Sequence, residues 1–141
     1  MGKIPKKGIN KHAIAMKEKK LIEKYYDCFK CKVNHQRLKC TGVIQPTDHS
    51  IEYEVEIKYD PPNKPLVKVI NPKIEYSDDI HMYHNNNSLC LYYPEDMIWS
   101  TSFNIYNTII PWTAEWLIFY ELYQITGKWK HPEVKHKKIT D

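Results

Sequence analysis

The segment Ile51-Glu-Tyr-Glu-Val-Glu-Ile-Lys-Tyr59 alternates apolar and charged residues without a break. A period of two places successive side chains on opposite faces of a β-strand, so this pattern predicts a half-buried antiparallel strand. Residues 38–45 also favour a strand, and residues 46–50 predict the hairpin loop between the two. The proline-rich run 61–65 ends the central strand, and residues 66–70 predict the next one. The middle of the chain is therefore expected to form an antiparallel β-meander.

Helical patterns are found on both sides of this meander. Residues 12–28 place apolar side chains on one side among lysines and glutamates, which predicts an amphipathic N-terminal helix. The cluster Trp99-Ser-Thr-Ser102 predicts the cap of a short helix through Ile109. Proline is favoured in a first helical turn, so a further helix is expected to begin at Pro111 and to stop at Gly127. Together these patterns predict an α+β fold with C-terminal helices packed on one face of the sheet.

Length and composition indicate one packed domain, because 141 residues rich in tyrosine and tryptophan can bury a sizeable core. We expect the domain to cover residues 11–132, between basic tails at 1–10 and 133–141. The formal net charge of +4 is mild and comes mainly from lysines in these tails, and Arg37 is the only arginine. Since bidentate recognition of phosphates and bases relies on arginine, the composition argues against nucleic-acid binding.

The sequence also argues against a membrane protein. Glu115 and Glu121 interrupt the most apolar segment, and the N-terminus lacks the apolar core of a signal peptide. We therefore expect a cytoplasmic protein with no membrane contact. In that reducing compartment its four cysteines are not expected to form disulfides.

Cys90 lies in the short apolar run Ser88-Leu-Cys-Leu-Tyr-Tyr-Pro94, behind a loop rich in histidine and asparagine. His81 and His84 belong to that loop. The thiolate is the reactive form of cysteine, and a neighbouring imidazolium or loop N–H donors would lower the thiol pKa. Free cysteine is also often a small buried core residue. From spacing alone, a nucleophile and a structural thiol both remain open.

A second cluster consists of cysteines and a histidine near the start of the meander, namely Cys28, Cys31, His35 and Cys40. Its spacing approaches that of a zinc knuckle but is one residue short between the second cysteine and the histidine. The strand expected at 38–45 would also place Cys40 on one face of a sheet, away from a compact metal-binding loop. A small zinc-binding nucleic-acid module is nevertheless kept as an alternative.

Several short stretches between about residues 38 and 132 occur in a specific order: Cys40-Thr-Gly-Val-Ile-Gln-Pro-Thr47, Ile51 to Tyr59, Val67-Lys-Val-Ile-Asn-Pro72, His81-Met-Tyr83, Leu89-Cys-Leu-Tyr-Tyr-Pro94, Trp99, Ile109-Ile-Pro-Trp112, Glu115-Trp-Leu117, Tyr120-Glu121, Thr126-Gly-Lys-Trp129 and His131-Pro132. In this order and spacing they resemble ubiquitin-conjugating enzymes. The resemblance is closer to the bacterial relatives encoded in type II CBASS antiphage operons beside a CD-NTase, a cGAS-like cyclic-nucleotide synthase. It implies a ubiquitin-conjugating-enzyme-like (UBC) fold.

The resemblance also implies site residues and a reaction. Cys90 matches the catalytic cysteine, His81 is similar to the histidine of the bacterial subfamily, and Tyr83-His84-Asn85 is similar to the family's His-Pro-Asn triplet without its proline. Because that proline is missing, the resemblance leaves open which of His81, His84 and Asn85 faces the thiol. Cys90 would accept the C-terminal carboxyl group of the CD-NTase as a thioester and pass it to an amine. No cofactor is implied.

The expected partner follows from the same resemblance: a CD-NTase, and above all its C-terminal tail. The sequence contains no phosphate-cradling glycine loop, so we expect activation of the carboxyl group to come from elsewhere. A non-catalytic binding partner of the CD-NTase, with the same fold and a silent cysteine, is the alternative function.

Overall fold

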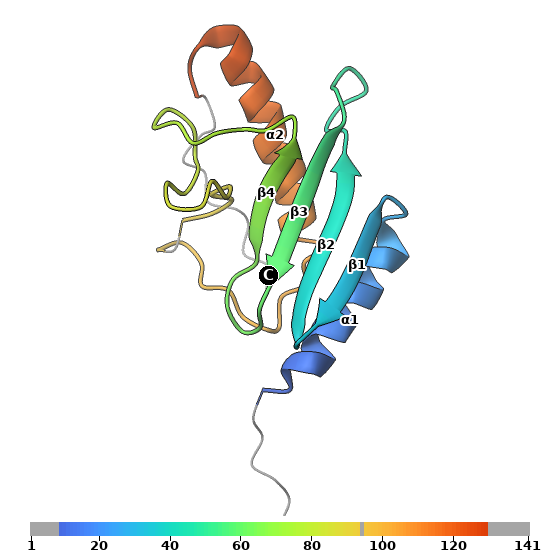
Figure 1. Ribbon diagram of the computed structural model, residues 1–141. Helices are drawn as coiled ribbons and strands as arrows, with labels where there is room; N and C mark the ends of the chain where they lie inside the picture. The colour runs from blue at the N-terminus through green and yellow to red at the C-terminus, as the bar shows by residue number, and fades with distance from the viewer. Residues whose placement is uncertain (1–8, 94, 130–141) are drawn as a thin grey trace, which may run out of the picture.

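The computed structural model describes residues 9–93 and 95–129. The elements follow the order α1 (Lys11–Tyr25), β1 (Phe29–Asn34), β2 (Arg37–Ile44), β3 (Tyr53–Tyr59), β4 (Leu66–Asn71) and α2 (Ile109–Thr126). The strands form one antiparallel sheet in the order β1-β2-β3-β4, with α1 and α2 behind one face and the other face open (Figure 1). The predicted α+β class, with an N-terminal helix and an antiparallel meander, is confirmed.

Strand β3 is central and shows the alternation that its sequence predicts. Tyr53, Val55, Ile57 and Tyr59 are each at most 1% exposed, whereas the residues between them are partly or fully exposed. Burying side chains of this size stabilises the fold by roughly 1.5–3 kcal/mol each. Ile51 lies before the strand and is 57% exposed, so the buried face begins two residues later than the sequence pattern.

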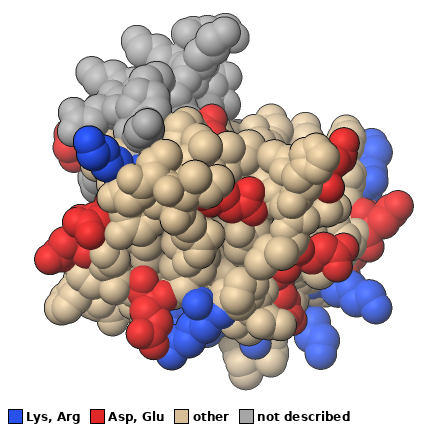
Figure 2. All heavy atoms as spheres, turned by 90° about the horizontal axis from the view of Figure 1, so that it is seen from above, with Lys and Arg blue, Asp and Glu red and all other residues tan. Residues whose placement is uncertain are grey.

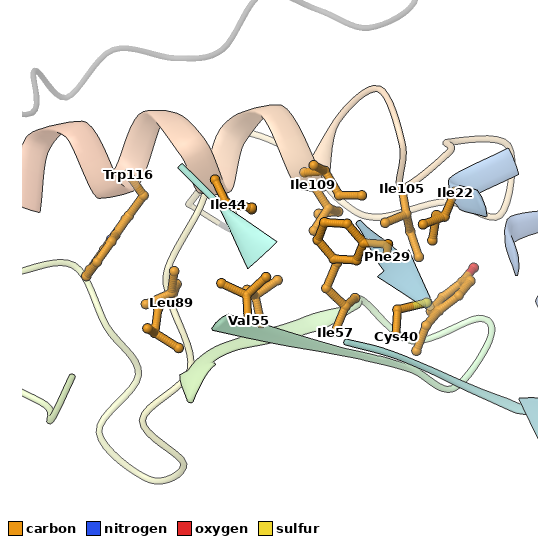
Figure 3. Close-up of a cluster of buried hydrophobic side chains, with 14 of the residues drawn as sticks. Ile22, Phe29, Cys40, Ile44, Val55, Ile57, Leu89, Ile105, Ile109 and Trp116 are labelled. Atoms are coloured by element: carbon orange, nitrogen blue, oxygen red, sulfur yellow. The ribbon is translucent and has the colours of Figure 1, made fainter. Parts of the chain in front are cut away.

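The buried face of the sheet packs against α2. Figure 3 shows Ile109 and Trp116 of α2 on one side of the core, with Val55, Ile57 and Leu89 on the other. All five side chains are at most 4% exposed. The buried Leu89 side chain belongs to the same core, which anchors the segment that also carries its neighbour Cys90.

Strand β1 was not predicted, although Phe29, Cys31 and Val33 alternate there with lysines. It pairs with β2 so that Cys31 lies directly opposite Cys40, and the two sulfur atoms are joined in a disulfide. Both side chains point into the core, at 6% and 0% exposure. The expectation that the cysteines stay unpaired is therefore wrong for this pair, because the β1–β2 hairpin places two thiols nine positions apart in the sequence directly opposite one another.

The candidate zinc cluster is also separated by this pairing. Cys28 is exposed, and its thiol donates to the carbonyl oxygen of Val43 at 3.2 Å. His35 lies at the β1–β2 turn with φ of 52°. In the part of the chain that the structure describes, no group of three or more His, Cys, Asp or Glu side chains is placed to hold a metal ion.

Helix α1 begins and ends for local reasons. Asn10 caps it by accepting a hydrogen bond from the backbone N–H of Ala13 at 3.0 Å. Its buried side chains, Ala15, Glu18 and Ile22, follow helical spacing and lie against β1 and β2. The helix ends at Tyr25, before the predicted end at residue 28, because the chain is already extended at the following residue as it enters β1.

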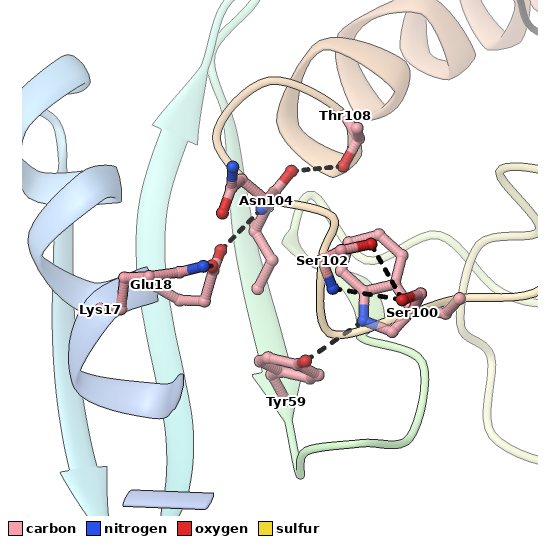
Figure 4. A network of polar contacts seen from close by, with 9 residues as sticks. Lys17, Glu18, Tyr59, Ser100, Ser102, Asn104 and Thr108 are labelled. Atoms are coloured by element: carbon pink, nitrogen blue, oxygen red, sulfur yellow. Dashed lines mark hydrogen bonds and ion pairs between the residues drawn. The ribbon is translucent and has the colours of Figure 1, made fainter. Parts of the chain in front are cut away.

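The C-terminal region contains one helix in place of the predicted two. Pro111 lies in the first turn of α2, and Gly127 ends the helix in the left-handed conformation with φ of 74°, both as predicted. The short helix expected through Ile109 is wrong, because residues 100–108 form turns. There the Oγ atom of Ser100 accepts a hydrogen bond from the Ser102 N–H at 3.2 Å, a local bond that competes with a helix (Figure 4).

These turns are tied to the rest of the core by two long-range hydrogen bonds. The Trp99 indole donates to the Tyr59 hydroxyl at 3.2 Å, and the Ile105 N–H donates to the Glu18 carboxylate at 2.8 Å (Figure 4). Glu18 has no exposed surface, and burial raises the pKa of its carboxyl group, although the Ile105 bond and Lys17 partly offset this. The ionised form of Glu18 is therefore destabilised in the folded state.

We expect Glu18→Gln to make the free energy of unfolding less dependent on pH. Because the folded-state pKa is raised, the stabilisation from protonated Glu18 is fully present below the unfolded pKa of 4.5 and is lost as pH rises through the folded pKa. Glutamine keeps an acceptor for Ile105 and carries no charge, so the variant should gain stability relative to the parent from about pH 4 to about pH 7. Urea unfolding at both pH values measures the difference in the free energy of unfolding between the variant and the parent. The same difference at both pH values would contradict a raised pKa for Glu18 in the folded state.

No described helix combines the length and the apolar character that crossing a membrane demands.

Candidate functional site

Cys90 is positioned by backbone pairing along the free edge of β4. The Leu89 N–H donates to the Val67 carbonyl at 2.9 Å, and Leu89 forms an isolated antiparallel bridge with Met82. The Cys90 N–H donates to the His81 carbonyl at 3.0 Å. Leu89 and Met82 are buried, at 4% and 9% exposure, so the segment is anchored by its apolar side chains. The sheet edge thus holds the backbone of Cys90 in place, directly beside that of His81.

A tight asparagine-rich turn joins these two paired segments. The Tyr83 N–H donates to the Ser88 carbonyl at 2.8 Å, and Asn86 Oδ1 accepts hydrogen bonds from both the N–H and the hydroxyl of Ser88, at 3.0 and 2.6 Å. Asn87 adopts φ of 57°, and its Oδ1 accepts from the Tyr76 N–H at 3.2 Å. The side chains of Asn86 and Asn87 therefore stabilise the turn itself.

His84 and Asn85 lie at the exposed tip of this turn. The His84 ring packs edge-on against the Tyr76 ring, with 4.9 Å between the centroids. The sequence prediction that they belong to the loop preceding the cysteine is confirmed, and whether either one faces a substrate at Cys90 stays a prediction.

The Cys90 thiol is half-buried and donates to the Tyr92 carbonyl at 3.4 Å. Burial raises the pKa of this thiol. A hydrogen bond from the Tyr83 side chain, the positive charge of Lys64 and a backbone hydrogen bond at Tyr92 offset part of that rise, and Glu95 adds to it. The net direction is opposite to the one that an adjacent imidazolium would impose, because loss of solvation outweighs the stabilising groups.

Tyr83 and Lys64 form a unit beside the thiol. The Lys64 ammonium lies over the Tyr83 ring, 3.8 Å from its centroid, which is a close cation–π contact. Burial lowers the pKa of Lys64, and the charge of Cys90 partly restores it. Burial and the neighbouring thiolate raise the pKa of Tyr83, so the phenol keeps its proton at neutral pH and can donate it to the sulfur. The groups that can stabilise a thiolate here are thus a phenol and an ammonium.

His81 shares a backbone hydrogen bond with Cys90, but its ring lies in an aromatic group. Its Nε2 is 3.2 Å from the Tyr93 hydroxyl, and its ring centroid is 5.3 Å from that of Trp129. The His81 carbonyl also accepts a hydrogen bond from the Trp116 indole at 2.8 Å. The structure therefore brings His81 to the site through its backbone and packs its imidazole against aromatic rings.

The role of Lys64 is not evident from the sequence, where it is one residue of a proline-rich loop. It reaches Cys90 only because β3 and β4 pair and place their connecting loop beside the thiol. Tyr83 lies within the predicted loop, and its position next to His84 is the one sequence signal that pointed to it.

The family model described as "Type II CBASS E2 protein" matches residues 18–137. The comparison with curated proteins gave no match. The matched region contains the whole sheet, the segment with Cys90 and all of α2, and the helix–meander–helix order is that of a ubiquitin-conjugating-enzyme-like fold. The chain belongs to the Type II CBASS E2 family.

Proposed function

We propose that Cys90 carries an acyl group as a thioester, accepting the C-terminal carboxyl group of a CD-NTase and passing it to a target amine. The observation that supports this most strongly is the placement of the thiol: it is held by the sheet edge, half-buried, and next to a phenol donor and an ammonium. Membership in the Type II CBASS E2 family supports a conjugating-enzyme-like role.

The chemistry requires a donor whose carboxyl group is already activated as an acyl adenylate or a thioester. The Cys90 sulfur bonds to the acyl carbon, the activating group leaves with its electron pair, and the thiol proton passes to solvent or a base. In the second step an amine attacks the same carbon, its nitrogen gives up a proton to a base, the carbon–sulfur bond breaks, and the sulfur leaves as a thiolate. Both steps pass through a negatively charged oxygen and generate or consume a thiolate, so nearby donors and cations accelerate both.

Within this proposal, Tyr83 and Lys64 stabilise the thiolate. The Tyr83 hydroxyl donates a hydrogen bond to the sulfur, and the Lys64 ammonium supplies positive charge from above the Tyr83 ring. Hydrogen bonds to charged groups contribute about 1.5–3 kcal/mol, enough to offset part of the desolvation of a half-buried thiolate.

His81 is the candidate base for the attacking amine, because its backbone is bonded to that of Cys90. Asn85, at the exposed turn, is the candidate donor to the oxyanion, and His84 is the alternative base. Replacing each residue with alanine and measuring separately the formation and the discharge of the thioester distinguishes these roles. Loss of a base slows discharge to an amine, whereas loss of an oxyanion donor slows both steps.

Co-expression with the CD-NTase and the other proteins of the same operon, in the native host that supplies any activating enzyme, tests the proposal. We expect intact mass spectrometry under non-reducing conditions to show a species equal to both proteins minus one water, which disappears on addition of a thiol. A CD-NTase lacking its last residues should give none.

A non-catalytic partner of the CD-NTase is the second candidate, and the burial that raises the Cys90 pKa favours it. In that case the two proteins form a stable complex that contains no covalent adduct and does not change in a Cys90→Ala variant.

A further inference from the structure

Three lysines lie side by side across the sheet, on adjacent strands at the same register. Lys32 of β1 is opposite Lys39 of β2, which is opposite Lys58 of β3. Like charges directly opposite one another destabilise a sheet. Glu56 offsets part of this repulsion, with its carboxylate 3.5 Å from the Lys39 ammonium and 3.7 Å from that of Lys58. Lys39 and Lys58 nevertheless keep about three-fifths of their side-chain surface exposed, at 58% and 59%.

This row forms part of a basic hollow at the end of the sheet where β1 turns into β2 and β3 into β4, the lower end in Figure 1. The hollow has a volume of about 610 Å³. The cationic residues that line and define this basic hollow are Lys32, Arg37, Lys39, Lys58 and Lys64. Asp60 is the acidic residue in the lining, and it is already paired with Lys11 at 2.9 Å and with Arg37 at 3.6 Å.

The lining of the basic hollow carries five cationic side chains and one acidic side chain. Figure 2 looks down on the opposite end of the molecule, where acidic side chains are spread over the visible surface and lysine and arginine side chains lie near its margins. The basic hollow therefore has a distinct electrostatic character, which favours an anionic occupant.

Lys64 connects the basic hollow to the candidate site. It lines the hollow, contacts the Tyr83 ring and acts electrostatically on the Cys90 thiol. A chain that lies in the hollow and continues past Lys64 therefore approaches Cys90. The acyl donor in the proposed reaction is itself a chain that ends at the reacting carboxyl group.

We propose that the basic hollow binds an acidic segment of the acyl donor, located shortly before the carboxyl group that Cys90 receives. This inference rests on the proposed function and adds that the acyl donor is negatively charged shortly before its C-terminus. Alternate side chains of an extended peptide project to the same face about 6.6–6.8 Å apart, and neighbouring strands lie about 4.8 Å apart. The flexible four-carbon stem of lysine can cover this difference, so Asp or Glu residues at alternate positions can each meet a lysine of the row.

The lining favours an acidic peptide over a nucleic acid. Binding of single strands usually relies on exposed aromatic rings that stack on bases. Tyr59 is the aromatic residue of the lining, and it is 1% exposed. Arg37 is the arginine of the lining, and it is paired with Asp60, so bidentate recognition of phosphate is reduced.

Two synthetic peptide thioesters test the inference. They share the same last few residues and the same length, and one carries Asp and Glu upstream where the other carries Ser and Gly. Transfer of each peptide to Cys90 is followed by intact mass spectrometry at low and at physiological salt, in the parent and in a Lys39→Gln/Lys58→Gln variant. A Lys20→Gln/Lys24→Gln variant removes the same charge from exposed positions on α1, behind the opposite face of the sheet, and is the matched control.

We expect the acidic peptide to acylate the parent and the α1 control at least ten times faster than the neutral peptide at low salt, and to lose most of this advantage in the Lys39→Gln/Lys58→Gln variant and at physiological salt. Equal rates for both peptides in the parent would overturn the inference and leave the proposed function standing. Transfer of neither peptide would instead contradict the proposed function.

Binding alone provides an independent readout. The acidic peptide, as an unreactive amide with a fluorescent label, should bind the parent more tightly than the Lys39→Gln/Lys58→Gln variant by fluorescence anisotropy. A single-stranded DNA oligonucleotide of equal charge should bind more weakly than this peptide at physiological salt. Tighter binding of the DNA would overturn the inference in favour of a nucleic-acid site. Thermal unfolding should show that the variant is about as stable as the parent, because it loses both the repulsion between the lysines and their exposed ion pairs with Glu56, which are small effects of opposite sign.

Discussion

The Cys90→Ser variant is expected to form an adduct with the CD-NTase tail that resists thiols, whereas Cys90→Ala should form none. Serine can accept the acyl group as an oxyester, which is far less reactive toward thiols and amines than a thioester. The serine hydroxyl is also a much weaker nucleophile than a thiol, so the adduct should accumulate slowly and then persist. Non-reducing gels and intact mass spectrometry, with and without added thiol, measure both properties.

Cys28→Ser is the matched control for this prediction, because Cys28 is the other free cysteine of the described chain and is exposed. This variant should form the thiol-sensitive adduct to the same extent as the parent. An adduct that persists in Cys90→Ala and is lost in Cys28→Ser would show that Cys28, and not Cys90, accepts the acyl group.

Tyr83→Phe and Lys64→Met are expected to raise the pKa of the Cys90 thiol above its already raised value. Each removes a group that lowers this pKa, the first a hydrogen-bond donor and the second a positive charge. Loss of a hydrogen bond to a charged group is worth about 1.5–3 kcal/mol, which corresponds to a rise of one pKa unit or more. Alkylation of Cys90 by iodoacetamide near neutral pH should therefore slow about tenfold in Tyr83→Phe.

Measuring the alkylation rate across pH, with each modified cysteine mapped by peptide mass spectrometry, separates a pKa effect from blocked access. A pKa effect shifts the midpoint to higher pH and leaves the rate at high pH unchanged. Lys64→Arg should restore most of the parent profile, because arginine keeps the charge and the contact with the Tyr83 ring. His84→Ala is the control at the exposed turn. A midpoint that stays fixed in Tyr83→Phe but rises in His84→Ala would show that the His84 imidazole, and not the Tyr83 phenol, lowers the pKa of the Cys90 thiol.

Those parts of the fold that depend on short-range periodicity were predictable from the sequence. The alternation ending at Tyr59 predicted the buried face of β3, and Pro111 and Gly127 predicted the two ends of α2. Both signals are local: a period of two determines which side chains share a face, and proline and glycine fit specific backbone conformations. Identification of Cys90 needed the order of many short stretches, because a lone cysteine near histidines is a weak signal.

The parts that were not predicted depend on how segments pair in space. In β1, Phe29, Cys31 and Val33 alternate with lysines, a local strand pattern that the zinc-like cysteine spacing obscured; its pairing with β2 joins Cys31 to Cys40 and separates the supposed zinc ligands. Residues 100–108 form turns because the Ile105 amide bonds to Glu18, which lies 87 positions away in the sequence. Lys64 reaches the thiol through the β3–β4 connection. The contacts of Ile105 and Lys64 leave no periodic trace in the sequence.

The central claim is that Cys90 accepts an acyl group, and the most direct measurement bypasses the unknown activating step. The purified protein is mixed with a short uncharged peptide whose C-terminus is supplied as a thioester, and the product is analysed by intact mass and then by peptide mapping under non-reducing conditions. The account predicts the gain of a single acyl group, located on Cys90 and released by hydroxylamine. A protein that gains no acyl group, or gains it equally in Cys90→Ala, would contradict it.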